Sequence, residues 1–214
     1  DALWLDRLEG FNNNLMTGSV SAPPTTPTIM PYDARWHSTA ARLGERISKA
    51  IEDLEAGDHA PAEGVFAVEH IGSTSVPGLG AEDVIDLQVG VRTLNEADSA
   101  GFVEALQRQG FPRIEGNTSD DPLPWVGDAM AWQKRFHGSV DPGRSTHVHV
   151  RQVDGPGWRY ALLFRDWLRA NPDERDAYAA LTSRLARSTD TKSQFVQAKG
   201  PWVMEALERA DAWA

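Results

Sequence analysis

The chain of 214 residues contains no cysteine, which excludes disulfides and thiolate metal sites and is compatible with a cytoplasmic location. No apolar run approaches the ~18 residues of a membrane span, and the start lacks the basic and apolar regions of a signal peptide. Basic residues are also scarce. The 21 Lys and Arg against 31 Asp and Glu give a formal net charge of −10. We therefore expect no membrane partner and no broad nucleic-acid surface, while a small anionic ligand would need a metal or a local cation cluster.

The composition predicts one domain with an appendage. Hydrophobic residues make up 41% of the chain, enough for a real core. Residues 19–28 are rich in Pro, Ser and Thr, a composition typical of a linker. We therefore divide the chain into an N-terminal segment with linker, 1–28, and a domain, 29–214. No Gly-x-x-x-x-Gly-Lys-Ser/Thr motif occurs, so this chain by itself should not be a P-loop kinase.

Hydrophobic periodicity, caps and turn residues predict an α/β fold without internal repeats. In the first half of the chain we expect a helix at 33–54, strands at 65–71 and 84–91, a helix that begins at a capping box at 93 and ends at about 110, and a strand at 111–114. In the second half we expect strands at 132–137 and 146–153, which are joined by a turn at 141–144. Helices at 157–170, 173–187 and 191–213 complete the chain. Gly200-Pro201 should kink or divide the last helix.

A Gly-Ser turn follows the first expected strand. Gly72 lets the backbone approach a ligand closely, and Ser73 and Thr74 can offer hydroxyl and N–H groups to phosphate oxygens. Asp86 follows Ser73 by thirteen residues on the next strand and can hold a divalent cation. A nucleotidyltransferase of the DNA polymerase β type builds its phosphate-and-metal site in this way. The alternative is a structural turn with local caps.

Strand alternation places Asp86 and Gln88 on one face of 84–91, opposite the apolar residues. A buried carboxylate is costly unless it is paired or binds a metal. Asp86 therefore contacts a metal or substrate, or forms an ion pair with Arg144 or Arg151. Gln88 is a poor Mg²⁺ ligand, which favours one weakly held metal, or a binding site without catalysis, over a two-metal centre.

His147 and His149 project from one face of a later strand. Two imidazoles can bind a transition metal, donate to phosphate, or act as a general base, and His70 could join them. The alternative is that they are hydrogen-bonded neighbours of a buried carboxylate. We expect them to share a site with Asp86.

The segment His70–Leu79, His-Ile-Gly-Ser-Thr-Ser-Val-Pro-Gly-Leu, resembles the core motif of the GrpB family, which is assigned to the nucleotidyltransferase superfamily. Further matches occur in order at Tyr32-Asp33, Trp36, His147–Val150, Phe164–Arg169, Tyr178 and Lys199. The resemblance covers about 29–214 and implies a DNA polymerase β-like core with a mixed sheet and C-terminal helices. The chain departs from the family pattern at Glu82-Asp83, where Lys-Pro is usual, and from polymerase β-type sites at Gln88, where a second acid is usual.

The resemblance implies transfer of a nucleoside monophosphate from a metal-bound nucleoside triphosphate, with Mg²⁺ on Asp86, to an unknown acceptor. Ser73 and Thr74 would hold the phosphates, and His147 and His149 would assist the acceptor or the leaving phosphate. The other expected contacts to a phosphorylated ligand are His70, Gly72, Gln88, Arg144, Arg165 and Lys199. Arg165 could equally pair with its neighbour Asp166.

A second interpretation is a non-catalytic module. In actinobacteria a GrpB-like domain commonly follows a dephospho-coenzyme A kinase on one polypeptide, and residues 1–18 look like the tail of that kinase. The domain would then aid folding of the kinase or regulate it by binding nucleotide. A third interpretation is a free-standing enzyme with a specialised small-molecule acceptor. The sequence leaves open whether the domain is an enzyme.

Overall fold

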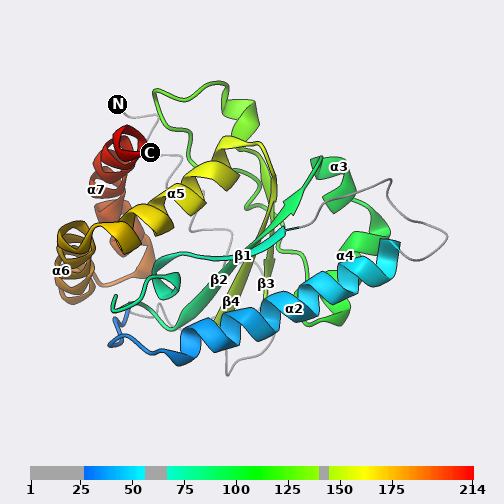
Figure 1. Ribbon diagram of the computed structural model, residues 1–214, viewed down its shortest axis with the longest axis horizontal. Helices are drawn as coiled ribbons and strands as arrows, with labels where there is room; N and C mark the ends of the chain where they lie inside the picture. The colour runs from blue at the N-terminus through cyan, green and yellow to red at the C-terminus, as the bar shows by residue number, and fades with distance from the viewer. Residues whose placement is uncertain (1–26, 56–66, 140–144) are drawn as a thin grey trace.

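The computed structural model describes residues 27–55, 67–139 and 145–214. In chain order its elements are α2 (Arg35–Glu55), β1 (Ala67–Ile71), the 3₁₀ helix η1 (Ser73–Ser75), β2 (Val84–Val91), α3 (Leu94–Ala97), α4 (Ala100–Arg108), the 3₁₀ helix η2 (Ala129–Trp132), β3 (Lys134–Gly138), β4 (Ser145–Gln152), α5 (Pro156–Ala170), α6 (Pro172–Ser188) and α7 (Lys192–Trp213) (Figure 1). Residues 1–26 of the expected N-terminal segment and the turn at 141–144, with Arg144, lie outside the described residues. None of the described helices is long and apolar enough to cross a membrane.

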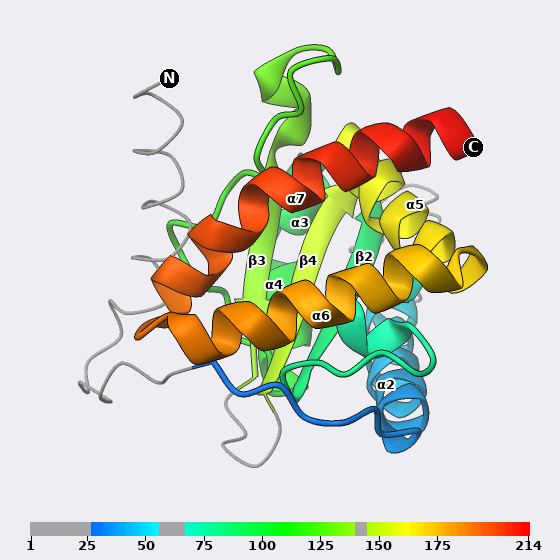
Figure 2. The same ribbon diagram turned by 90° about the vertical axis from the view of Figure 1, so that its left-hand side faces the viewer.

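The sheet is mixed and has the order β1-β2-β4-β3. Its central pair, β2 and β4, is parallel, and both outer pairings are antiparallel. Figure 2 shows α6 and α7 in front of the strands, α4 behind them and α2 beside them at the lower right. The expected α/β class, with a mixed sheet and C-terminal helices, is confirmed.

Alternation along β2 and β4 divides the sheet into an apolar face and a polar face. Leu87 and Val89 lie opposite Val148 and Val150 in the register, and all four are at most 1% exposed. They form one core with the apolar stripe of α2 and with α4. Burying such side chains stabilises each by roughly 1.5–3 kcal/mol. The intervening side chains therefore point to the opposite face, beneath α5 to α7.

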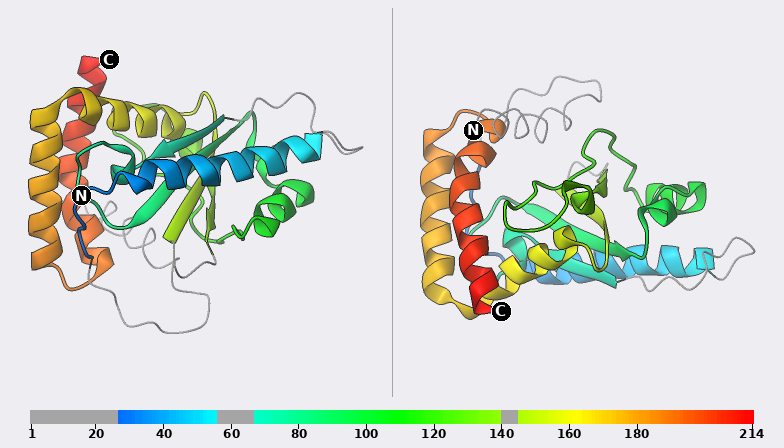
Figure 3. Two further views of the ribbon diagram at one scale, coloured as in Figure 1. Left: turned by 60° about the horizontal axis from the view of Figure 1, so that its bottom comes forward. Right: turned by 90° about the horizontal axis from the view of Figure 1, so that it is seen from above.

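A second apolar cluster joins the loop after η1 to the C-terminal helices. Val76 and Leu79 are fully buried against Trp167 of α5 and Tyr178 of α6. Arg169 donates from Nη2 to the Ser75 carbonyl at 2.8 Å. The left view of Figure 3 shows α6 and α7 packed beside each other at one end of the molecule. The Gly-Ser loop is thus held between the sheet and this helical layer.

Three expected elements differ. The helix expected at 93–110 is two helices, because the Ser99 hydroxyl accepts the Phe102 N–H and caps a second start. The strand expected at 111–114 is reduced to a single bridge from Arg113 to His137. Pro201 does not divide α7. Buried residues on both sides of it, Phe195 and Ala206, keep the helix packed as one element.

Candidate functional site

The polar face of the sheet carries a pocket of about 300 Å³. In the parallel register Asp86 lies opposite His147, and Gln88 lies opposite His149. Asp86 and both histidines line the pocket together with Gly72 and Ser73. The structure therefore brings together the expected loop, the carboxylate and the pair of imidazoles.

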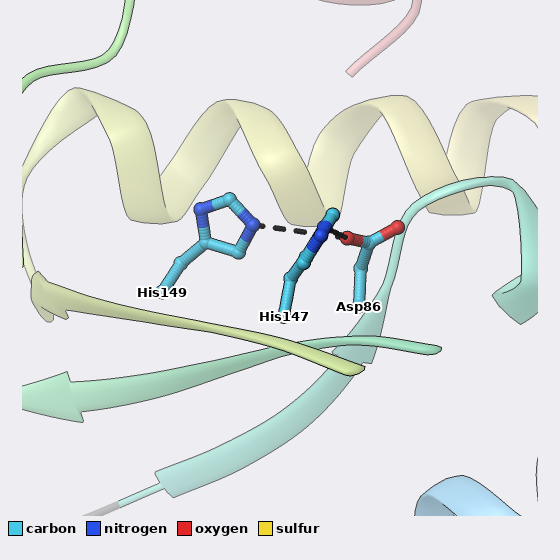
Figure 4. Close-up of side chains that lie close together, drawn as sticks. All are labelled: Asp86, His147 and His149. Carbon is cyan, nitrogen blue, oxygen red and sulfur yellow. Dashed lines mark hydrogen bonds and ion pairs between the residues drawn. The ribbon is translucent and has the colours of Figure 1, made fainter. Parts of the chain in front are cut away.

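Asp86 is the centre of a three-residue cluster (Figure 4). Its Oδ1 lies 3.0 Å from His147 Nδ1 and 3.8 Å from His149 Nε2. One ligand atom from each residue lies within 4.8 Å of the other two. Burial raises the pKa of Asp86, but the hydrogen bonds of the two histidines and their electrostatic attraction outweigh burial and hold it well below its usual range. The carboxylate is ionised, and because it only accepts, His147 Nδ1 donates to it.

Gly72 is required by its contact with that carboxylate. Its φ of 71° and ψ of −176° lie in a region that is essentially restricted to glycine and costs an L side chain on the order of 1–3 kcal/mol. A Cβ at this position would also lie 2.5 Å from Asp86 Oδ2. Only glycine therefore lets the loop lie against the carboxylate, with Oδ1 turned to His147 and Oδ2 facing the loop.

Thr74 and His70 brace the loop and do not line the pocket. Thr74 is fully buried, and its hydroxyl donates to the Val84 carbonyl at 3.0 Å. The hydroxyl proton is committed there, so the contact at 3.1 Å is a donation from His70 Nε2 to Thr74 Oγ1. Burial, followed by the charge of His37, lowers the pKa of His70 to about 4. These two residues therefore fix the loop on β2.

Two other expected contacts point into internal networks. Gln88 is fully buried; its Oε1 accepts from Arg151 Nη1 at 2.8 Å and its amide donates to the Trp158 carbonyl. Arg165 donates to Glu69 Oε2 at 2.7 Å and to Asp166 Oδ1 at 2.8 Å. Neither side chain lines the pocket. Gln88 satisfies buried polar groups of the scaffold, whereas Arg165 is held by two part-exposed carboxylates.

A buried ion cluster, Asp120 with Lys134 and Arg151, lies behind His149. Asp120 accepts from Lys134 Nζ at 2.6 Å and from Arg151 Nε at 2.7 Å. His149 Nδ1 lies 3.4 Å from Arg151 Nη2 and 3.5 Å from Lys134 Nζ. Burial, followed by these two cations, lowers the pKa of His149 to about 3. Since an arginine only donates, the proton of neutral His149 is on Nε2, toward Asp86.

Helix α7 supplies the opposite wall with Lys192, Val196, Lys199 and Val203. The spacing of four, three and four residues places them on one helical face, a signal that the sequence analysis used only at Lys199. Burial lowers the pKa of Lys199, but Tyr178, Glu82 and Asp86 outweigh burial and raise it. The pocket therefore presents a cation to a ligand.

The pocket also has an aromatic wall and an amide that the sequence analysis missed. Phe136 of β3, Phe164 of α5 and Tyr178 of α6 line it, as does Asn117 from the loop before β3. These residues come from four separate parts of the chain. No local pattern marks Asn117, because its neighbours form an ordinary polar loop.

Comparison with known proteins identifies the family. The model of the family described as "GrpB protein" matches residues 26–209, which confirms the resemblance. A dephospho-CoA kinase of Mycolicibacterium paratuberculosis is 38% identical over 99% of this chain and 52% of its own length. A UPF0157 protein of Deinococcus radiodurans is 31% identical over 95% of this chain and 93% of its own. The chain thus spans about half the length of the dephospho-CoA kinases it matches.

The fold is also that of a solved structure. The crystal structure of the conserved protein GrpB from Enterococcus faecalis matches with a TM-score of 0.67 and 23% identity. The match covers 87% of this chain and all of that one.

Proposed function

The chain belongs to the GrpB family, and from this premise we propose that its pocket binds a nucleoside triphosphate with a divalent cation and transfers the nucleoside monophosphate to an acceptor. One observation carries the proposal. Asp86 is an ionised carboxylate whose Oδ2 faces the Gly72–Ser73 loop inside a pocket. A carboxylate beside a loop that can donate to phosphate is the arrangement that cation-bound phosphates require.

The residues fit a divalent cation, but the donors are mixed. Asp86 Oδ1 and His147 Nδ1 lie 3.0 Å apart in the pocket, and a cation held by both would take the place of the proton that Nδ1 donates to Asp86, leaving the neutral ring protonated on Nε2. An imidazole beside a carboxylate suits Mn²⁺ or Zn²⁺ better than the Mg²⁺ expected from the resemblance. Asp86 and His147 would hold the cation, which would supply charge neutralisation and Lewis acidity at the phosphate.

His149 is better placed to donate a hydrogen bond than to ligate. For Nε2 to bind a metal, its proton would have to move to Nδ1, which faces Arg151 and Lys134. With the proton on Nε2, His149 is a neutral donor directed toward Asp86 in the pocket. It would donate to an oxygen of the leaving phosphate, as a preorganised donor in a partly dry site.

Two further groups would hold the phosphates. Ser73 lines the pocket from the loop, where its hydroxyl can donate. Lys199 approaches from α7, and its raised pKa keeps it charged. Together with the cation, these donors offset the charge of the phosphates in a chain of net charge −10.

A second candidate function is that of an accessory module of a dephospho-coenzyme A kinase. Two observations favour it. The chain is similar to about half the length of proteins named dephospho-CoA kinase. Gln88 is an amide bound to Arg151 in the scaffold, so the histidine cluster contains one carboxylate, Asp86. In that function the pocket binds nucleotide without turning it over.

A thermal-shift experiment tests the shared premise. ATP, GTP, CTP and UTP would each be added with Mg²⁺, with Mn²⁺ and without a cation. We expect the unfolding midpoint to rise with at least one nucleotide in the presence of a cation, because selective binding stabilises the folded state. Cation alone and nucleoside alone are the controls. No shift with any pair would contradict both functions, whereas a shift without release of pyrophosphate on incubation would favour the accessory module.

A further inference from the structure

Asn117 is a buried polar residue in an exposed loop. It is 7% exposed, whereas Glu115, Gly116, Thr118 and Ser119 around it are exposed. Gly116, with φ of 94°, gives the loop the turn that directs the next side chain inward. The loop therefore places an amide inside the protein at a position where a solvent-facing one would be ordinary.

The amide oxygen of Asn117 has no hydrogen-bond partner within the described part of the chain. Most buried side-chain oxygens are paired, so an unpaired one needs an explanation. The residue lines the pocket with Phe136, Phe164 and Tyr178. A ligand in the pocket is the partner that would satisfy this oxygen.

The chemistry of an amide oxygen restricts which part of a ligand it can meet. It accepts hydrogen bonds, and so do the oxygens of an ionised phosphate, so the two cannot pair. The donors suited to phosphate are elsewhere in the pocket, at Ser73 and Lys199. The aromatic side chains offer the apolar contact that the flat face of a base takes.

We infer that Asn117 reads the nucleoside part of the ligand, accepting a hydrogen bond from an N–H of the base or an O–H of the sugar. The inference rests on the proposed function and adds to it the residue that selects the nucleoside. The amide remains unpaired in the free protein because the ligand is its partner. Free-state stability is then sacrificed for recognition, as is common at binding sites.

Asn117→Leu tests this because leucine has similar size and no polar atom. The unfolding midpoint of the free protein should not fall and should rise if the unpaired oxygen is costly. The dissociation constant of the best nucleotide, measured by calorimetry with Mn²⁺, should increase about tenfold. Asn117→Ala is the second variant should leucine fail to fold, and Thr118→Val, an exposed neighbour, should change neither quantity.

The panel of bases and a 2′-deoxynucleotide separate the two donors. A loss confined to some bases identifies a base N–H, and a loss shared by all bases but absent with the 2′-deoxynucleotide identifies the sugar hydroxyl. Either supports the inference. Unchanged nucleotide affinity in both variants overturns it and leaves the proposed function standing. A loss of affinity for Mn²⁺ alone also overturns it, since Asn117 would then be a cation ligand. If the wild type binds no nucleotide, the inference falls with the proposed function.

Discussion

Asp86 and Asp120 are two part-buried carboxylates that flank His149, and their partners differ. Asp120 accepts from Lys134 and Arg151, so two basic side chains surround it. Among the residues that the structure describes, the ion-pair partners of Asp86 are both histidines. Side-chain exposure is similar, at 16% for Asp120 and 24% for Asp86. The comparison teaches that partners decide which carboxylate remains able to attract a cation, whereas burial alone does not.

The largest expected effect on stability comes from removing the charge of Asp120, the carboxylate with two basic partners. Asp120→Asn removes the anion that buried Lys134 and Arg151 share, and should lower the free energy of unfolding by about 3–5 kcal/mol. Chemical denaturation measures this. Glu104→Gln, which removes an exposed i,i+4 pair with Arg108, is the control and should change stability by less than about 0.5 kcal/mol. Equal small effects would show that the cluster is not a structural ion network.

Mild acid should protonate a histidine on unfolding while Asp86 and Asp120 stay ionised, so it distinguishes the two kinds of group. Burial is the main cause that lowers the pKa of His137 to about 4, whereas an exposed histidine has a pKa of 6.5. As the pH falls, the unfolded chain therefore binds this proton before the folded chain does. The contribution of His137 to stability is then full above pH 6.5 and falls by up to about 1.4 kcal/mol per pH unit down to about pH 4. Both carboxylates have a pKa well below the usual range and remain ionised in this window. In urea denaturation from pH 7 to 4, the free energy of unfolding should fall less steeply for His137→Gln than for the wild type. Identical slopes for the two proteins would show that His137 does not cause the acid destabilisation.

A methyl group at Gly72 probes the open side of Asp86. Gly72→Ala forces a Cβ to 2.5 Å from Asp86 Oδ2, in addition to the positive φ. Gly127→Ala shares a positive φ but meets no atom within 4 Å, so it measures the cost of a positive φ without a steric contact. The extended ψ of −176° at Gly72 adds to the difference between the two variants. We expect Gly72→Ala to lower stability by about 1 kcal/mol or more beyond the control. If thermal unfolding gives equal losses, the loop does not depend on the carboxylate.

The smallest expected effect on stability belongs to Asp86 itself. In Asp86→Asn the amide oxygen can still accept from His147 Nδ1, so this hydrogen bond is kept, and no described Lys or Arg loses an ion-pair partner. The free energy of unfolding should change by less than about 1 kcal/mol. A loss as large as that of Asp120→Asn in the same denaturation assay would remove the distinction between the two carboxylates.

Alternation and spacing within one strand or helix could be predicted from the sequence. Asp86 on the non-core face of β2 and the paired histidines of β4 follow from a period of two. The destinations of Gln88 and Arg165 could not, because their partners Arg151 and Glu69 are 63 and 96 residues away. Long polar side chains reach several partners, and tertiary packing selects one.

Asp120 and Asn117 show the same limit. Asp120 lies in a polar loop, and nothing near it in the sequence indicates that Lys134 and Arg151 will converge on it. Pro201 is an example in which a local signal is present but does not decide the structure. The sequence predicts that it kinks or divides the last helix, whereas packing along α7 keeps the helix continuous. Local chemistry therefore located the centre of the site, and the long-range contacts determine its walls and supports.

Calorimetric titration of ATP with Mn²⁺ into wild type and Asp86→Asn tests the central claim most directly, with GTP, CTP or UTP in place of ATP if one of them gives the larger thermal shift. Glu82→Gln is the matched control, a pocket carboxylate that already has a cation partner, Lys192, at 3.7 Å. We expect Asp86→Asn to weaken cation-dependent binding at least about tenfold, as loss of a hard anionic ligand requires, while Glu82→Gln does not weaken it. Equal affinity of wild type and Asp86→Asn would contradict the account and make Asp86, like Asp120, a structural carboxylate.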